Sequence, residues 1–140
     1  MRKEYVQSNK QAIGAELNLH DTKMTMVVWH YQERSVSLEL TNWEWDSKGR
    51  LFFEGAACLE GSALGLWGGD LESPIYINYI MADADGAVSD MFARSVQSSE
   101  ASPEDYEFPD PNPYFCVVLG TNMGDRIRFM VTKVVWESDD

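Results

Sequence analysis

Two neighbouring runs, MTMVVWHY at residues 24–31 and SVSLEL at residues 35–40, indicate most directly how this chain folds. The first run is rich in β-branched and aromatic residues, which suit the pleated surface of a sheet. The second run alternates strictly, so Val36, Leu38 and Leu40 share one face of a strand. Both runs therefore predict β-strands, the second with one buried face.

Similar signals recur along the rest of the chain. Further strands are predicted at 50–59, 75–81, 87–96, 114–119 and 126–136, and the turn ADADG (82–86) predicts a hairpin between the second and third of these. Strands joined by short turns predict an antiparallel meander that forms a barrel or a sandwich. The fold class is therefore mainly β, or α+β if residues 3–17 form a short N-terminal helix.

Length and composition narrow the class of protein. A chain of 140 residues with 44% hydrophobic content fits one folded domain, residues 1–140. No apolar run approaches the roughly 20 residues of a membrane helix, and no apolar segment follows the basic N-terminus as in a secretion signal. Cys58 and Cys116 lie in apolar runs and are expected to be small buried side chains. We expect a cytoplasmic protein without membrane association.

The negative charge is concentrated in one part of the sequence. Residues 51–125 contain thirteen acids and one base, Arg94, and so account for the entire net charge of −12. The other residues hold ten acids and ten bases. Segregated acidity predicts an electric field with a direction, whereas evenly spread acids would favour only solubility.

The most acidic stretch is also rich in proline. SSEASPEDYEFPDPNPYF, at 98–115, holds four of the five prolines and five carboxylates, with no lysine or arginine. We predict a Pro-rich acidic loop at about 97–113, inserted before the last two strands, in which residues 100–110 form a partly extended recognition segment. A mobile surface loop is the alternative. Tyr106 and Phe108 alternate with Asp105 and Glu107, so in an extended chain the aromatic side chains and the acids face opposite sides.

Residue patterns typical of catalysis are weak in this chain. His20 and His30 are the only histidines, and the sequence lacks the ligand spacing of a zinc site, a complete calcium loop and a phosphate-binding loop. Glu44, between Trp43 and Trp45 and followed by Asp46, is the candidate for a carbohydrate-binding or carbohydrate-hydrolysing site. We expect a protein that is not an enzyme and has no metal and no cofactor.

Acids interspersed with aromatic residues are typical of surfaces that bind a basic protein. In character, though in no residue motif, this profile resembles immunity proteins that inhibit nuclease-type toxins, which implies a toxin or nucleic-acid-binding enzyme as partner and no direct contact with nucleic acid. A mimic of nucleic acid that inhibits a host or defence enzyme is the alternative, and simple solubility is another; the oligomeric state is left open. The residues predicted to contact the partner are Glu100, Glu104, Asp105, Tyr106, Glu107, Phe108 and Asp110, together with Asp70, Glu72, Asp83 and Asp85.

Overall fold

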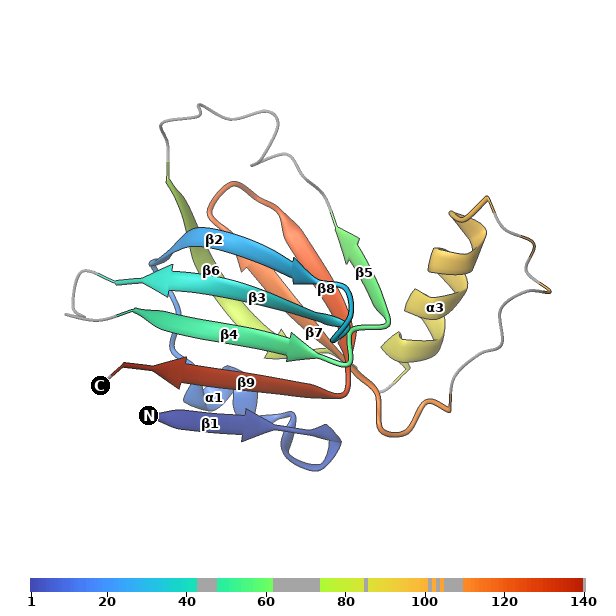
Figure 1. Cartoon of the computed structure of the whole chain (residues 1–140), viewed down its shortest axis with the longest axis horizontal. Helices are drawn as coiled ribbons and strands as arrows, with labels where there is room; N and C mark the ends of the chain where they lie inside the picture. Colours follow the sequence, from blue (N-terminus) through green and yellow to red (C-terminus); the bar gives the residue numbers. More distant parts are fainter. Residues whose placement is uncertain are drawn as a thin grey trace.

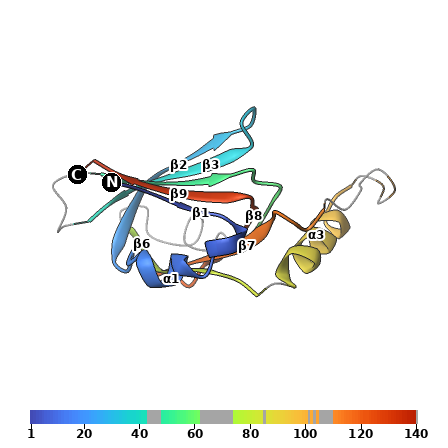
Figure 2. The same ribbon diagram turned by 90° about the horizontal axis from the view of Figure 1, so that it is seen from below.

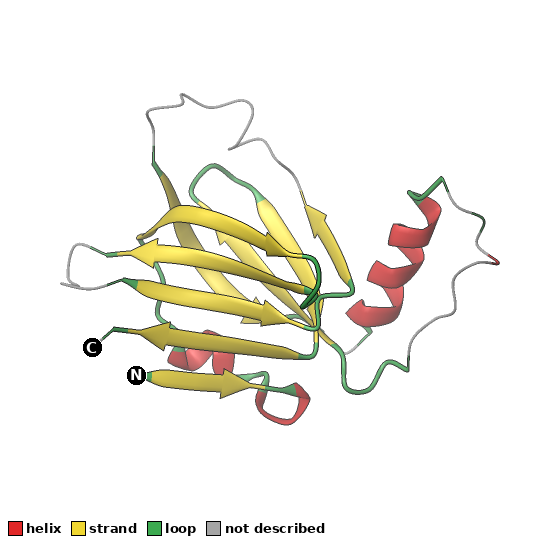
Figure 3. Ribbon diagram, viewed as in Figure 1, coloured by secondary structure: helices red, strands yellow, loops and turns green. Residues whose placement is uncertain are grey.

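A computed structural model describes residues 1–42, 48–61, 74–84, 86–100, 102, 104 and 110–139 of the chain. These residues form one sheet of nine antiparallel strands with two α-helices (Figures 1 and 3). The strands are β1 (Arg2–Tyr5), β2 (Thr22–His30), β3 (Ser35–Thr41), β4 (Gly49–Glu54), β5 (Cys58–Gly61), β6 (Ile75–Ala82), β7 (Phe115–Thr121), β8 (Arg126–Val131) and β9 (Lys133–Ser138). The helices are α1 (Ala12–Glu16) and α3 (Ala87–Gln97), with a 3₁₀ turn, η1 (Gln7–Asn9), before α1.

The fold is mainly antiparallel β as predicted, but the sheet follows a meander only in part and is not a barrel. Along the sheet the order is β1-β9-β4-β3-β2-β6-β7-β8-β5, so β2–β3–β4 and β6–β7–β8 are two three-stranded meanders. The end strands β1 and β5 do not pair with each other in the part of the chain that is described, so a closed barrel is wrong. Side chains of β4 and β8 pack on each other and so join the two halves of the open sheet.

The core lies between the two halves of this folded sheet. Val36, Leu38 and Leu40 are buried, as the alternation in β3 predicts. The rings of Phe53 in β4 and Phe129 in β8 stack with centroids 4.0 Å apart and planes 5° apart. Burying aromatic and aliphatic side chains in this way is the dominant favourable contribution to folding.

One sharp corner carries the chain from one half of the sheet to the other. The run 126–136, predicted as one strand, divides at Thr132 into β8 and β9, and these strands pair with different neighbours. The backbone N–H of Thr132 donates to the carbonyl oxygen of Glu54 at 3.0 Å. Gly55 has a positive φ of 64°, and a Cβ there would meet the Thr132 side chain. The run 50–59 divides at the same glycine into β4 and β5.

The segment 87–96, predicted as a strand, is helix α3 instead. Val88 and Met91 are fully or nearly buried and lie three residues apart, which is the spacing of one helix face. Polar Ser89 and Asp90 between them are exposed. A strand would have placed Val88 and Asp90 on the same face, so the helix separates apolar from polar side chains better.

The N-terminal segment 3–17 is helical only in part: α1 and the turn η1 lie within it, whereas its first residues belong to strand β1. Ile13 is fully buried in the core, and Leu17 and Leu19 just beyond the helix are also buried. Tyr5, which ends β1, donates a hydrogen bond from its hydroxyl to the Glu16 carboxylate at 2.8 Å. None of the helices in the described ranges is long and apolar enough to cross a bilayer.

Candidate partner-binding site

The structure describes four of the eleven predicted contact residues. Glu100, Glu104 and Asp110 are exposed, and Asp83 is half-buried. Asp83 precedes α3 in the chain and the other three follow it. Helix α3 lies at one end of the molecule, away from both termini (Figures 1 and 2). The other seven predicted contact residues lie outside the described residues; they are Asp70, Glu72, Asp85, Asp105, Tyr106, Glu107 and Phe108. Glu44, the candidate for a carbohydrate site, also lies outside them.

Helix α3 is held against the outer face of the sheet by a small second core. Val88 and Met91 pack with Cys116 of β7 and Met130 of β8, and Phe92 adds a partly buried ring. The thiol of Cys116 lies 3.8 Å from the Met91 sulfur. This packing explains why every residue of β7 is buried, since one face meets the main core and the other lies near α3.

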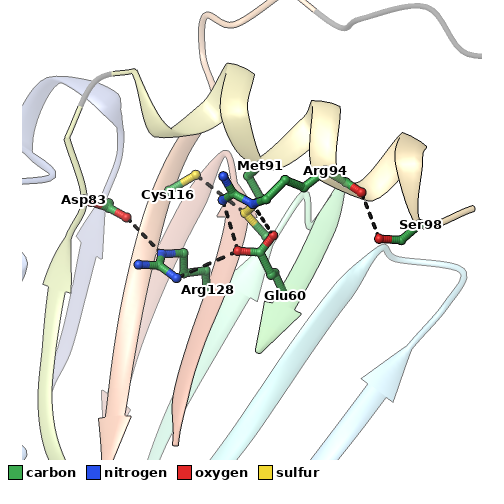
Figure 4. Close-up of polar contacts among 7 residues, drawn as sticks. All are labelled: Glu60, Asp83, Met91, Arg94, Ser98, Cys116 and Arg128. Carbon is green, nitrogen blue, oxygen red and sulfur yellow. Dashed lines mark hydrogen bonds and ion pairs between the residues drawn. The ribbon is translucent and has the colours of Figure 1, made fainter. Parts of the chain in front are cut away.

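A network of ion pairs fixes the exposed side of the helix (Figure 4). Arg94 of α3 donates two hydrogen bonds to the Glu60 carboxylate of β5, at 2.6 and 3.0 Å. Arg128 of β8 donates to Asp83 at 3.2 Å and lies 3.8 Å from Glu60. Two-point pairing of an arginine with a carboxylate restricts orientation as well as adding attraction, so the helix is aligned on β5.

The same network shifts the ionisation of its central carboxylate. The pKa of Glu60 is lowered, chiefly because Arg94 donates hydrogen bonds to it, with the charges of Arg94 and Arg128 contributing and partial burial opposing. The pKa of Arg94 is raised, first by the hydrogen bond to Glu60. Both groups are therefore charged at neutral pH.

Asp83 has a structural role in addition to its predicted one. One carboxylate oxygen accepts from Arg128, and the other accepts from the backbone N–H of Ala84 at 2.8 Å. Its own backbone N–H donates to the carbonyl oxygen of Cys116. Because its charge is matched by Arg128 within the chain, Asp83 is a poorer candidate for partner contact than the exposed acids.

We call α3 and the described part of the connection after it, residues 98–100, 102, 104 and 110–113, the acidic end. Its exposed carboxylates are Asp90, Glu100, Glu104 and Asp110. Its only cation is Arg94, which is paired with Glu60 from β5. The side chain of Asp110 accepts from the backbone N–H of Asn112 at 3.1 Å, which orders the turn that leads into β7.

A groove runs between the start of α3 and the strands beneath it, with a volume of about 490 Å³. Glu60, Asp83 and Asp90 contribute three carboxylates to its walls, and Arg94 and Arg128 contribute two cations. A cationic side chain entering this groove would meet a surplus of negative charge. Arg94 and Arg128 pair with Glu60 and Asp83, so the surplus is one negative charge, that of Asp90, which suits a lysine or arginine of a partner.

A second cavity was not predicted from the sequence. It has a volume of about 330 Å³ and lies between the two halves of the sheet, with a mainly apolar wall. Val27 and Trp29 of β2 and Leu59 of β5 line it, and these side chains are 40–50% exposed. Strand alternation indicates which residues share a face, but a gap between two faces depends on how the sheet bends.

Both cysteines are free thiols. Cys116 is buried, as predicted, and burial raises its pKa to about 11, with the charge of Asp83 as the next cause. Cys58 is only half-buried. Met130 lies opposite both cysteines in the register of β5, β8 and β7, so two strand spacings of about 4.8 Å separate them and exclude a disulfide.

Comparisons with known proteins found no match: no family model, no curated protein and no solved structure is significantly similar to this chain. Within the described ranges, no three of the side chains of His, Cys, Asp and Glu are grouped so that they could hold a metal ion.

Proposed function

We propose that this protein is a non-catalytic, acidic binding protein that neutralises a basic partner protein, and that it acts as an immunity protein against a nuclease-type toxin. It acts in the cytoplasm without metal or cofactor. Nuclease toxins bind phosphates with basic surfaces, so an acidic inhibitor gains both a faster encounter and complementary contacts.

The observation that carries this proposal is the way the cations near the acidic end are used. Arg94, the only base between residues 51 and 125, is bound to Glu60, and Arg128 is bound to Asp83. Internal pairing occupies these cations, while Asp90, Glu100, Glu104 and Asp110 remain exposed. The acidic end is therefore a source of negative potential, and potentials of this kind steer basic partners.

The two histidines support a non-catalytic role. His30 shares a hydrogen bond with the Ser37 hydroxyl at 3.1 Å, and His20 with the carbonyl oxygen of Asn78 at 3.0 Å. His30 is the last residue of β2 and His20 precedes the first, so the length of the strand separates them and they do not form one acid–base site. General acid–base chemistry needs such groups positioned together on a substrate.

The partner is sought first in the product of the neighbouring gene. If that product is a toxin, its expression should stop growth and co-expression of this protein should restore it. Binding is then measured at about 50 and about 300 mM NaCl, because added salt screens steering between exposed charges. The variant D90N/E100Q/E104Q/D110N should associate about tenfold more slowly than the parent at low salt and lose most of the salt dependence.

A control variant separates the acidic end from net charge. D21N/E33Q/E137Q/D139N removes the same charge from residues outside the 51–125 segment and should bind as the parent does. If the two variants behave alike, or if the acidic-end variant neutralises the toxin as well as the parent, the proposal is wrong. If no dedicated toxin is found and this protein instead displaces nucleic acid from many host nucleases, the nucleic-acid mimic is indicated.

A further inference from the structure

The sheet has four strand edges that lack a neighbouring strand within the described ranges. Residues 78–82 of β6 form one of them and have α1 packed against them. Two others are the outer edges of the end strands β1 and β5. The fourth is the part of β2 beyond Met24, because β2 pairs with β6 only through Thr22, Lys23 and Met24. Such an edge presents backbone N–H and C=O groups that can pair with another strand.

The end strands carry the usual protection against such pairing. Each has only four residues. Three of the four in β1 are charged (Arg2, Lys3 and Glu4), and β5 contains Glu60, which is held by Arg94. Short length and charge are devices that prevent edge-to-edge association.

The edge of β2 has neither device. Its stretch Met26–His30, MVVWH, is five residues long and contains no lysine, arginine, aspartate or glutamate. Strand β3 pairs with one side of all five residues, so the backbone is held extended, and no strand in the described part of the chain pairs with the opposite edge. Exposed apolar edges of this kind are sites of strand addition.

A bulge at Thr25 creates this edge. The register with β3 shifts between Met24 and Met26, and the Thr25 hydroxyl donates to the carbonyl oxygen of Glu39 at 3.1 Å. Bulges bend a strand and increase its twist. The β2–β3 hairpin consequently projects from the body of the molecule, where another chain can reach it (Figure 2).

Large apolar side chains are exposed along the same strand and at its turn. Met26, Val27 and Trp29 are 47–50% exposed, and Tyr31 is 83% exposed. The rings of Trp29 and Tyr31 stack, with centroids 6.2 Å apart. Clustered exposed aromatic and aliphatic side chains are typical of the centres of protein interfaces.

We propose that a second copy of this chain covers the edge, with the two β2 strands paired antiparallel about a two-fold axis at Val28. This register is centred on the free stretch, so it pairs all five residues. Val27 then faces the second copy's Trp29 on the sheet face that lines the apolar cavity. Met26 faces the second copy's His30 on the opposite face. Aromatic and β-branched pairs of this kind stabilise antiparallel strands.

The distribution of charge favours a second copy at this place. Two molecules that each carry a net charge of −12 repel each other, and the repulsion is strongest between their 51–125 segments. The β2–β3 hairpin belongs to the part of the chain in which acids and bases balance. Contact through this hairpin therefore brings two copies together where repulsion is least.

Cross-linking tests the register. In V28C, prepared with C58S to remove the half-buried thiol, the two introduced thiols meet at the axis. Residues directly opposite in antiparallel strands have Cα atoms about 4.5–5.5 Å apart, which a disulfide can span. Mild oxidation should convert most V28C/C58S protein into covalent dimer. M81C/C58S, with a thiol at an exposed site on β6, should remain monomeric on a denaturing gel.

Sedimentation against concentration tests the association itself. The parent should show a monomer–dimer equilibrium that V27E weakens by about tenfold or more, because two carboxylates then face the interface. M81E adds the same charge at a side chain of matched exposure, 48% against 47%, and should associate like the parent. A parent that stays monomeric at every concentration, or equal effects of V27E and M81E with the fold retained by circular dichroism, overturns the proposal.

Discussion

At the scale of single residues, Glu60 shows how the chain uses its few cations. Its carboxylate receives two hydrogen bonds from Arg94, 34 positions along the chain, and lies close to Arg128. The position is partly exposed to solvent, so water screens the attraction and each pair contributes modestly to stability. The main effect of the network is to fix the direction of α3 and to occupy both arginines.

Replacing Glu60 with glutamine should destabilise the protein in a pH-dependent way. The pKa of Glu60 is lowered in the folded state, so ionised Glu60 stabilises the fold above the ordinary carboxyl range, and that contribution is lost as the pH falls through the folded-state pKa. We expect E60Q to lower the Tm by roughly 2–4 °C at pH 7. The difference from the parent should shrink as the pH falls through and below the ordinary carboxyl range, in thermal scans followed by circular dichroism.

E100Q is the matched control, because Glu100 is exposed on the acidic end. It should leave the Tm unchanged at pH 7. A Tm difference for E60Q that persists at low pH would show that lost packing, and not lost charge, is responsible.

Much of the charge pattern could be predicted at this scale, but the pairing could not. Counting residues located the excess acid in 51–125 and identified Arg94 as its only base. The ion pair with Glu60 depends on α3 crossing β5, which no local pattern encodes. The same holds for Asp83, whose partner Arg128 lies 45 positions away.

At the scale of elements, α3 departs most from what the residue pattern predicts, because a helix stands where a strand was expected. The turn ADADG suggested a returning strand, although Val88, Met91 and Phe92 have the three- and four-residue spacing of a helix. The strands at 24–31, 35–40 and 114–119 were predicted correctly because their apolar residues are β-branched or alternate. The predicted strand at 126–136 missed the corner at Thr132, because only two residues separate the apolar run that ends β8 from the apolar run within β9.

Met91 anchors α3, so truncating it should loosen the helix. Its side chain is fully buried against Cys116 and Met130, and M91A should cost about 2–3 kcal/mol in the free energy of unfolding measured with urea. Burial raises the pKa of Cys116 to about 11, so its thiol is almost entirely protonated at pH 8 and reacts slowly. In a C58S background, M91A should increase the rate at which Cys116 reacts with a thiol reagent.

S89A supplies the comparison, because Ser89 is exposed on the same helix. It should change neither the urea midpoint nor the thiol reactivity appreciably. Equal reactivity of Cys116 in M91A, S89A and the C58S parent would mean that α3 does not shield this thiol.

At the scale of the whole molecule, one stacked pair of rings connects the two halves of the sheet. Phe53 and Phe129 lie on β4 and β8, which are not neighbours in the strand order. Both rings are buried in a core to which eight of the nine strands contribute. The two halves should therefore unfold together as one cooperative unit.

Removing one ring should weaken that unit without dividing it. F129A should lower the free energy of unfolding by about 3–5 kcal/mol and leave a single calorimetric transition, with the calorimetric and van 't Hoff enthalpies nearly equal. M123A, in the turn between β7 and β8, removes a 36% exposed side chain and should have little effect. Two resolved transitions in F129A would indicate halves that are stable independently.

The position of β9 has a consequence for biosynthesis. This strand lies between β1 and β4 and pairs with both, although it follows them by well over seventy residues in the chain. A nascent chain thus exposes one edge of β1 and one of β4 until the ribosome has released residues 133–138. During translation β1 and β4 therefore wait for a strand that is synthesised long after both of them.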